Sequence, residues 1–132
     1  MQEAFEIKGV QIGAGRPVIC VPVVETEAEK IVAKVRELTG KQVQMLEWRA
    51  DCFTDAGEPD QVRAVLERIR PFVQDTVVLF TFRTRKQGGN GCLPEKQILY
   101  LNEIAAKSKA VDLIDLEFFE ASRPEKEIRR FQ

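Results

Sequence analysis

The sequence predicts an α/β fold in which four βα units build a parallel sheet. Four apolar runs rich in β-branched residues are the expected strands, at residues 18–24, 43–49, 76–82 and 111–117. Helical patterns lie between these runs, and strands that alternate with helices of about 10–15 residues indicate a parallel sheet. With 132 residues and 44% hydrophobic side chains, the chain can bury one core but not two, so we expect a single domain over residues 1–132.

A short β-hairpin is expected before the first βα unit. Phe5-Glu6-Ile7 and Val10-Gln11-Ile12 flank Lys8-Gly9, and Gly13-Ala14-Gly15 follows them. Short runs of this kind on either side of a glycine-containing pair are typical of two antiparallel strands and their turn.

The first helix is expected to have Thr26 as its N-cap, because Glu29 three residues later completes a capping box. Gly40 stands where a glycine cap would end this helix. The apolar residues of the segment recur at helical spacing: Ile31, Val32, Val35 and Leu38.

Prolines mark the boundaries of the later helices. Pro59 opens the second helix, which stops before Pro71, and Pro94 precedes the third helix. Residues 123–126 have the pattern of the first turn of a fourth helix, shortly before Gln132. The second helix is expected to carry Val62, Val65, Leu66 and Ile69 on one face. The third helical segment contains Ile98, Leu99, Leu101, Asn102 and Ile104-Ala105-Ala106.

Two architectures accommodate four βα units: a small doubly wound sheet, or half of an eight-stranded (β/α) barrel. The glycine fingerprint of a dinucleotide-binding fold is missing after the first strand, where residues 24–27 read Val-Glu-Thr-Glu. A full barrel needs roughly 250 residues. Because the chain ends in the first turn of a helix, we expect a truncated chain: a half-barrel of the TIM-barrel, (β/α)₈ class, preceded by the hairpin.

Composition excludes several classes of function. The net charge is −1, with 31% charged residues of both signs, so the basic face of a nucleic-acid-binding protein is absent. No apolar run approaches the roughly 18 residues that span a bilayer. The first residues, Met1-Gln2-Glu3-Ala4-Phe5, lack the basic and apolar regions of a signal peptide. We therefore expect a cytoplasmic protein without nucleic-acid or membrane partners.

Cysteine and histidine usage argues against a metal centre and a disulfide framework. Cys20, Cys52 and Cys92 are odd in number and widely spaced, and none forms a Cys-x-x-Cys pair. The chain contains no histidine, so tetrahedral zinc would need cysteine and carboxylate ligands alone. We expect three plain thiols, with Cys20 the most buried, and no metal or cofactor.

A candidate ligand site lies at the carboxyl ends of the strands. Side chains of a strand alternate between its faces, so Glu47 and Arg49 share a face, and Arg83 follows the next strand in the same phase. Charges there are costly to bury unless they are paired or liganded. Arginine suits carboxylates, hydroxyls and phosphates. A ligand site at a barrel rim is the main interpretation, and an internal ion-pair network is the alternative.

The segment that follows Arg83 is basic and rich in glycine. Residues 85–91 read Arg-Lys-Gln-Gly-Gly-Asn-Gly and lack the Gly-Lys-Ser/Thr of a phosphate-binding Walker loop. Two explanations stay open, namely a loop whose glycines allow positive φ or close approach to a ligand, and an ordinary flexible surface loop. On the first explanation, Gln87 and Gly88 are possible ligand contacts.

Several motifs together resemble type I 3-dehydroquinate dehydratase, from about Ile7 to the end of the chain. The resemblance covers the first half of the family's chain. The motifs are Ile19-Cys20-Val21-Pro22, Leu46-Glu47-Trp48-Arg49-Ala50-Asp51, Leu79-Phe80-Thr81-Phe82-Arg83 with Gly88-Gly89, Leu101-Asn102, and Val111-Asp112-Leu113-Ile114-Asp115-Leu116-Glu117.

This resemblance implies a (β/α)₈-barrel lyase of the shikimate pathway that converts 3-dehydroquinate to 3-dehydroshikimate and water. In the family a lysine forms a Schiff base with the substrate ketone and a histidine moves the protons, without a cofactor. Glu47, Arg49 and Arg83 are implied to bind the ring hydroxyls of the substrate. The catalytic histidine and lysine are expected beyond Gln132, so this chain alone should be inactive.

Two departures from the family pattern concern fine details of binding. Gln87 stands where relatives often have glutamate, and Pro22 where some carry serine. A lysine of this chain is not expected to replace the missing one, because each fits a solvated helix, loop or hairpin position. These lysines are Lys8, Lys30, Lys34, Lys41, Lys86, Lys96, Lys107, Lys109 and Lys126.

Two rival hypotheses accompany the dehydratase. The first is a non-catalytic binding or assembly module, in which two half-barrels pair their open edge strands and form a homodimer. The second is another barrel enzyme of the aldolase type, which would also need a lysine from elsewhere.

Overall fold

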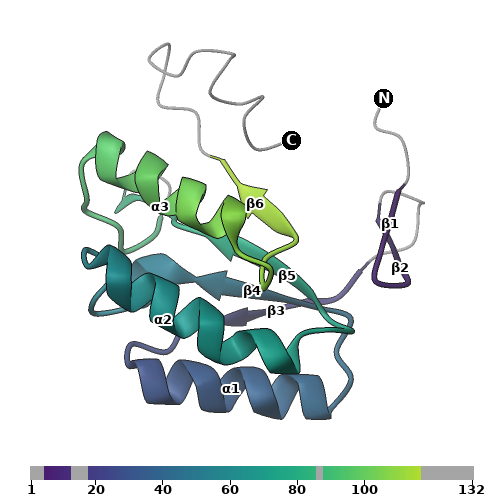
Figure 1. The fold of residues 1–132 in the computed structure, drawn as a ribbon. Helices are drawn as coiled ribbons and strands as arrows, with labels where there is room; N and C mark the ends of the chain where they lie inside the picture. The colour runs from purple at the N-terminus through teal and green to yellow at the C-terminus, as the bar shows by residue number, and fades with distance from the viewer. Residues whose placement is uncertain (1–4, 13–17, 86–87, 117–132) are drawn as a thin grey trace.

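The computed structural model describes residues 5–12, 18–85 and 88–116. A two-stranded hairpin precedes a four-stranded sheet with three helices (Figure 1). The strands are β1 (Phe5–Ile7), β2 (Val10–Ile12), β3 (Cys20–Val23), β4 (Met45–Arg49), β5 (Val77–Thr81) and β6 (Leu113–Asp115). The helices are α1 (Ala28–Gly40), α2 (Pro59–Ile69) and α3 (Glu95–Lys107), with 3₁₀ turns η1 (Ala50–Cys52) and η2 (Arg70–Phe72).

The larger sheet is parallel throughout and runs in the order β3-β4-β5-β6. Neighbouring strands in space are therefore consecutive along the chain, and each connection carries a helix. The described helices α1, α2 and α3 cover one face of the sheet (Figure 1). A doubly wound sheet has helices on both faces. The predicted α/β class is confirmed, and the arrangement agrees with the barrel alternative. Each strand is shorter than the apolar run that predicted it.

The core lies between the sheet and the helices. Leu46, Trp48 and Phe80 are fully buried, and the ring of Trp48 meets Phe80 edge to face at 5.5 Å between centroids. The alternation predicted for β4 is confirmed, because Leu46 and Trp48 face the helices while Glu47 points to the other side. The helical residues in this cluster include Ile31, Val35, Val62, Leu66, Ile98 and Leu101, all at positions predicted from their spacing.

The opposite face of the sheet carries a smaller apolar cluster. Val10, Met45 and Val77 are buried there, with Ile7, Leu79 and Leu113 packed against them. The hairpin of β1 and β2 thus contributes Ile7 and Val10 to the face that the helices leave uncovered. Its two-residue turn has positive φ at both positions, +51° at Lys8 and +77° at Gly9, which matches the twist of paired strands. The predicted hairpin is confirmed.

Lys8 contradicts the expectation that every lysine of the chain is solvated. Its side chain is mostly buried, and its Nζ forms an ion pair with Asp112 at 2.8 Å. The same nitrogen donates to the carbonyl oxygens of Val73 at 2.6 Å and Thr76 at 2.8 Å. A lysine in a turn looks exposed in the sequence, because its acceptors lie 65 or more residues away.

Two expectations about the ends of helix α1 are wrong. Helix α1 has Glu27 as its N-cap without a side-chain capping bond, so the box of Thr26 and Glu29 does not form. Glu29 instead receives a two-bond fork from Arg68 of α2. Gly40 is the last residue of α1, and the positive φ of +59° falls on Gln42.

Cys20, expected to be the most buried cysteine, is exposed because it begins the edge strand β3 on the face away from the helices. The thiols of Cys20, Cys52 and Cys92 are all free. Pro59 and Pro94 stand at the starts of α2 and α3, as predicted. Residues 13–15, Glu117 and the helical turn predicted at 123–126 lie outside the described residues. In the part of the chain that is described, no helix has the length and hydropathy to cross a membrane.

Replacement of Lys8 by methionine is expected to lower the free energy of unfolding by about 2 kcal/mol, because Asp112 and two carbonyls lose their donor. Urea denaturation followed by circular dichroism measures the change. The control is Lys30→Met, which breaks the exposed pair of Lys30 with Glu27 and should alter stability by less than about 0.5 kcal/mol. Equal effects of the two substitutions would contradict a structural role for the Lys8 contacts.

Candidate functional site

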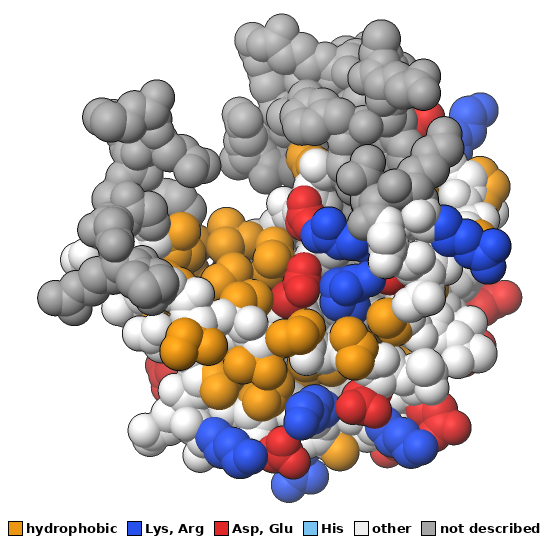
Figure 2. All heavy atoms as spheres, turned by 180° about the vertical axis from the view of Figure 1, so that it is seen from behind, with side chains coloured by type: hydrophobic (Ala, Val, Ile, Leu, Met, Phe, Trp, Pro, Cys, Tyr) orange, Lys and Arg blue, Asp and Glu red, His pale blue; other side chains and the backbone are white. Residues whose placement is uncertain are grey.

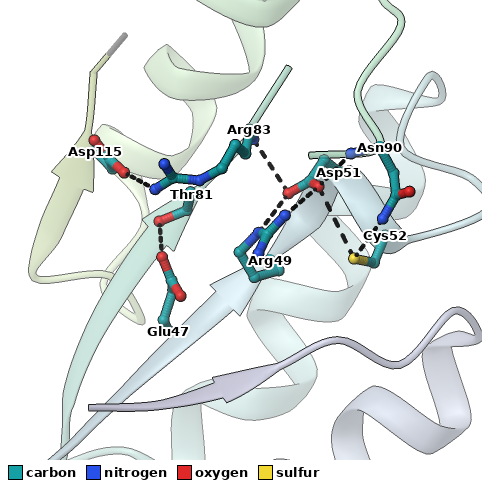
Figure 3. A network of polar contacts seen from close by, with 8 residues as sticks. All are labelled: Glu47, Arg49, Asp51, Cys52, Thr81, Arg83, Asn90 and Asp115. Carbon is teal, nitrogen blue, oxygen red and sulfur yellow. Dashed lines mark hydrogen bonds and ion pairs between the residues drawn. The ribbon is translucent and has the colours of Figure 1, made fainter. Parts of the chain in front are cut away.

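Charged side chains from three strands meet at the carboxyl end of the sheet (Figure 3). Glu47 and Arg49 belong to β4, Arg83 follows β5, and Asp115 ends β6. Parallel register brings them together, since Glu47 lies beside Leu79 and Arg49 beside Thr81. The structure therefore brings the three predicted residues, Glu47, Arg49 and Arg83, to one rim.

Arg49 is held by a carboxylate that the sequence analysis did not assign. Its Nε donates to Oδ1 of Asp51 at 2.9 Å, and its Nη2 donates to Oδ2 at 2.8 Å. Asp51 lies in the 3₁₀ turn that follows β4, and its side chain is fully buried. Figure 3 shows the guanidinium and the carboxylate facing each other in a planar fork. This contact uses one edge of a group that carries five N–H donors.

Asp51 also accepts two backbone hydrogen bonds from the segment after β5. The N–H of Arg83 donates to Oδ1 at 3.1 Å and the N–H of Asn90 donates to Oδ2 at 3.0 Å. Burial alone would raise the pKa of the Asp51 carboxyl, but the bonds from Arg49, Asn90 and Arg83 outweigh it and lower the pKa below its usual value. The hydrogen bonds from Arg49 to Asp51 raise the pKa of the guanidinium despite its partial burial. Both groups are charged at neutral pH.

Glu47 and Arg83 have separate partners. The hydroxyl of Thr81 donates to Oε2 of Glu47 at 2.7 Å. Nη2 of Arg83 donates to Oδ2 of Asp115 at 2.7 Å. The two arginines pair with Asp51 and Asp115, and Glu47 takes part in neither ion pair. The ion pairs of the alternative interpretation thus exist at this rim.

Ion pairing does not use up the polar surface of this site. The side chain of Arg49 is 19% exposed and that of Arg83 is 34% exposed. Figure 2 shows acidic and basic side chains clustered beside the hydrophobic surface of the sheet. The carboxylates therefore orient the guanidinium groups while part of each stays accessible. Such an arrangement donates hydrogen bonds to hydroxyl or carboxylate oxygens of a ligand.

The glycine-rich segment is built around the backbone of Arg83. Gly88 has φ of +84°, which favours glycine. A Cβ on Gly89 would collide with the carbonyl oxygen and the Cβ of Arg83, and one on Gly91 would collide with the ring of Phe82. Gly91 donates to the carbonyl of Arg83 at 3.0 Å. Close approach and positive φ, rather than an ordinary surface loop, account for these glycines. Gln87 lies outside the described residues.

The sequence analysis assigned no pairing to Asp115, Thr81 or Asp51, which contact Arg83, Glu47 and Arg49. Thr81 could have been found from strand alternation, because it shares a face with Leu79. Asp51 had a weaker signal: a carboxylate two residues after an arginine at the end of a strand. Asn90 reaches Asp51 and Cys52 across 38 or more residues of chain, for which the sequence offered no signal.

A parallel sheet with helices on one face, and with charged side chains at the carboxyl ends of its strands, is the arrangement of (β/α)-barrel enzymes. Residues 19–132 match the family model described as Type I 3-dehydroquinase. The chain belongs to this family.

Similar proteins agree on the family. The chain is 34% identical over 119 residues to 3-dehydroquinate dehydratase of Bacillus licheniformis, covering 90% of this chain and 47% of that protein. It is 36% identical to the Geobacillus thermodenitrificans protein of the same name, covering 86% and 45%. The chain thus spans about half the length of the curated relatives it matches.

Solved structures give the same result for the fold. The 3-dehydroquinate dehydratase of Geobacillus kaustophilus superposes with a TM-score of 0.88 at 32% identity, over 98% of this chain and 50% of that chain. The Type I 3-dehydroquinate dehydratase of Clostridium difficile, solved with covalent modified comenic acid, gives 0.83 at 34% identity, over 90% and 47%. The predicted family resemblance is confirmed.

Gly89→Ala is expected to lower the free energy of unfolding by about 1–3 kcal/mol, because the new methyl group meets the backbone of Arg83. The matched control is Gly40→Ala at the end of α1, where a Cβ meets open space and should stabilise the helix by up to about 1 kcal/mol. Thermal and urea unfolding measure both. A neutral Gly89→Ala would contradict the close approach of this segment to Arg83.

Proposed function

We propose that this chain is the substrate-binding half of a 3-dehydroquinate dehydratase, a lyase of the shikimate pathway that forms 3-dehydroshikimate and water. The observation that carries the proposal is the joint presence of Glu47, Arg49 and Arg83 at one rim of the sheet. Membership of the type I family supports it, as do relatives of that name.

The proposed roles follow from the chemistry of these groups. 3-Dehydroquinate is a hydroxylated ring acid, and each ring hydroxyl can donate one hydrogen bond and accept up to two. Glu47 accepts from a hydroxyl, while Arg49 and Arg83 donate to oxygen. Because Asp51 and Asp115 already hold the two guanidinium groups, the substrate meets donors whose directions are set before it binds. Gly88 and Gln87 are proposed as further contacts from the loop.

We further propose that the proton transfer and the Schiff base of the family reaction depend on residues outside this chain. The sequence contains no histidine. Of the described lysines, Lys8 is tied to Asp112 and two carbonyls, and Lys34 and Lys107 pair with glutamates on helices α1 and α3. This chain is therefore proposed to bind 3-dehydroquinate without dehydrating it.

Isothermal titration calorimetry of the purified chain with 3-dehydroquinate tests this function. We expect binding without release of 3-dehydroshikimate, and Arg83→Gln should weaken binding by roughly tenfold or more, since a charged hydrogen bond contributes about 1.5–3 kcal/mol. Arg68→Gln is the control, because Arg68 makes a similar fork with Glu29 on the helical surface. Product formation by the chain alone, or equal affinities of the two variants, would contradict the proposal.

A second proposal concerns assembly of the single domain 1–132 as half of a (β/α)₈ barrel. Within the described residues, β3 and β6 each have a neighbouring strand on one side only. Ile19 and Val24, which flank β3, are 73% and 48% exposed. Figure 2 shows hydrophobic side chains gathered on the face of the sheet opposite the helices. Open edges and an exposed apolar face favour pairing with another chain, so we propose a homodimer, which would also serve a non-catalytic binding module.

Light scattering after size exclusion tests the homodimer. We expect a mass near twice the 15.0 kDa of one chain. Ile19→Lys, beside the edge strand β3, should return the mass to that of a monomer. The matched control is Tyr100→Lys on α3, another exposed large side chain, which should leave the dimer intact. A monomeric unsubstituted chain would contradict the assembly.

We also propose a cytoplasmic location, with which the three free thiols agree.

A further inference from the structure

We propose that Asp51 is the positioning residue of this site, setting the direction of Arg49 and fixing the loop that carries Arg83 and Asn90. This inference rests on the proposed function where it concerns substrate, and it adds a residue to which sequence analysis gave no role. Asp51 is proposed to act through these neighbours and not by contact with substrate.

Burial separates Asp51 from a ligand. Its side chain is fully enclosed, whereas that of Arg49 in front of it is 19% exposed. A buried carboxylate is costly unless its oxygens are satisfied, and Asp51 meets this requirement with charged and backbone donors. In Figure 3 it lies between β4 and the segment after β5, with bonds running to both.

The bonds of Asp51 are divided so that each oxygen serves both segments. Oδ1 accepts from Nε of Arg49 and from the N–H of Arg83. Oδ2 accepts from Nη2 of Arg49 and from the N–H of Asn90. One carboxylate thus fixes the plane of a guanidinium and the backbone at Arg83 and at Asn90.

Positioning matters here because a free arginine side chain has many rotamers. Ordering it when a ligand binds costs conformational entropy. The two hydrogen bonds from Arg49 to the buried Asp51 fix the rotamer of the arginine before a ligand binds. The free protein therefore already holds the guanidinium in the direction needed for binding. The same partner holds the backbone of Arg83, and so couples the two arginines of the rim.

Asp51→Asn is the informative substitution, because asparagine has the same shape but replaces one oxygen by an NH₂ group. In either orientation that NH₂ faces one nitrogen of Arg49 and one backbone N–H, so the fork and one loop contact are lost together. The matched control is Asp112→Asn. Oδ2 of Asp112 likewise pairs with a cation, Lys8, and accepts a hydrogen bond from the backbone N–H of Val78. Asp112 precedes β6, so it lies at the amino end of the sheet and not at the rim.

Three measurements on the purified 132-residue chain decide the role. Thermal unfolding reports stability, ¹⁵N NMR reports the order of the Arg49 Nε–H and the exchange of the Arg83 and Asn90 amides, and calorimetry reports affinity for 3-dehydroquinate. We expect both variants to be less stable. Only Asp51→Asn should broaden the Arg49 signal, speed amide exchange at Arg83 or Asn90, whichever N–H faces the new NH₂ group, and weaken the binding of 3-dehydroquinate roughly tenfold.

Other outcomes separate this inference from the proposed function. An ordered Arg49 signal and protected amides in Asp51→Asn would overturn the positioning role, whatever the affinity. If the unsubstituted chain does not bind 3-dehydroquinate, the proposed function fails, and the NMR comparison of the two variants alone decides the role of Asp51. If the unsubstituted chain does bind 3-dehydroquinate, an unchanged affinity in Asp51→Asn would also overturn the positioning role of Asp51.

Discussion

Pairing of opposite charges at both ends of the parallel sheet governs which polar groups this fold can carry. At the carboxyl end, Arg49 pairs with Asp51 and Arg83 with Asp115. At the other end, Lys8 of the hairpin pairs with Asp112 just before β6. Between these ends the sheet is apolar on both faces. Because an unpaired buried charge is costly, these side chains are tolerated only where a counter-charge lies within reach. For Arg49 it comes from two residues further along the chain, and for Arg83 and Lys8 it comes from the segment of β6.

This requirement explains what could be predicted from the sequence and what could not. The fold was predictable because Leu46, Trp48 and Phe80 follow the two-residue period of a strand, and the helical residues follow their own period. The rim position of Glu47 and Arg83 followed from the same alternation. The contact of Lys8 with Thr76 and the contacts of Asp51 with the N–H groups of Arg83 and Asn90 were not predictable. The two residues of each contact lie 32 or more positions apart in the sequence. Pairing across the sheet has no local signature.

The failed capping box shows the same competition on a smaller scale. Glu29 had the spacing to bond the start of α1, yet it receives both terminal nitrogens of Arg68 from α2. Both carboxylate oxygens of Glu29 are therefore engaged by an arginine of the neighbouring helix instead of the backbone at the start of α1. Tertiary contacts thus override the local pattern wherever a long basic side chain reaches a carboxylate, both on the helical surface and at the rim.

Charge at the rim also indicates how the site would hold a ligand. Among the described residues, the network of Figure 3 contains three carboxylates, on Glu47, Asp51 and Asp115, and two guanidinium groups, on Arg49 and Arg83. The arginines are therefore already neutralised, and they do not form an anion clamp. Their remaining N–H groups act as oriented hydrogen-bond donors, which suits ring hydroxyls better than a carboxylate. A ring acid bound here would need its own carboxylate held by cations other than Arg49 and Arg83.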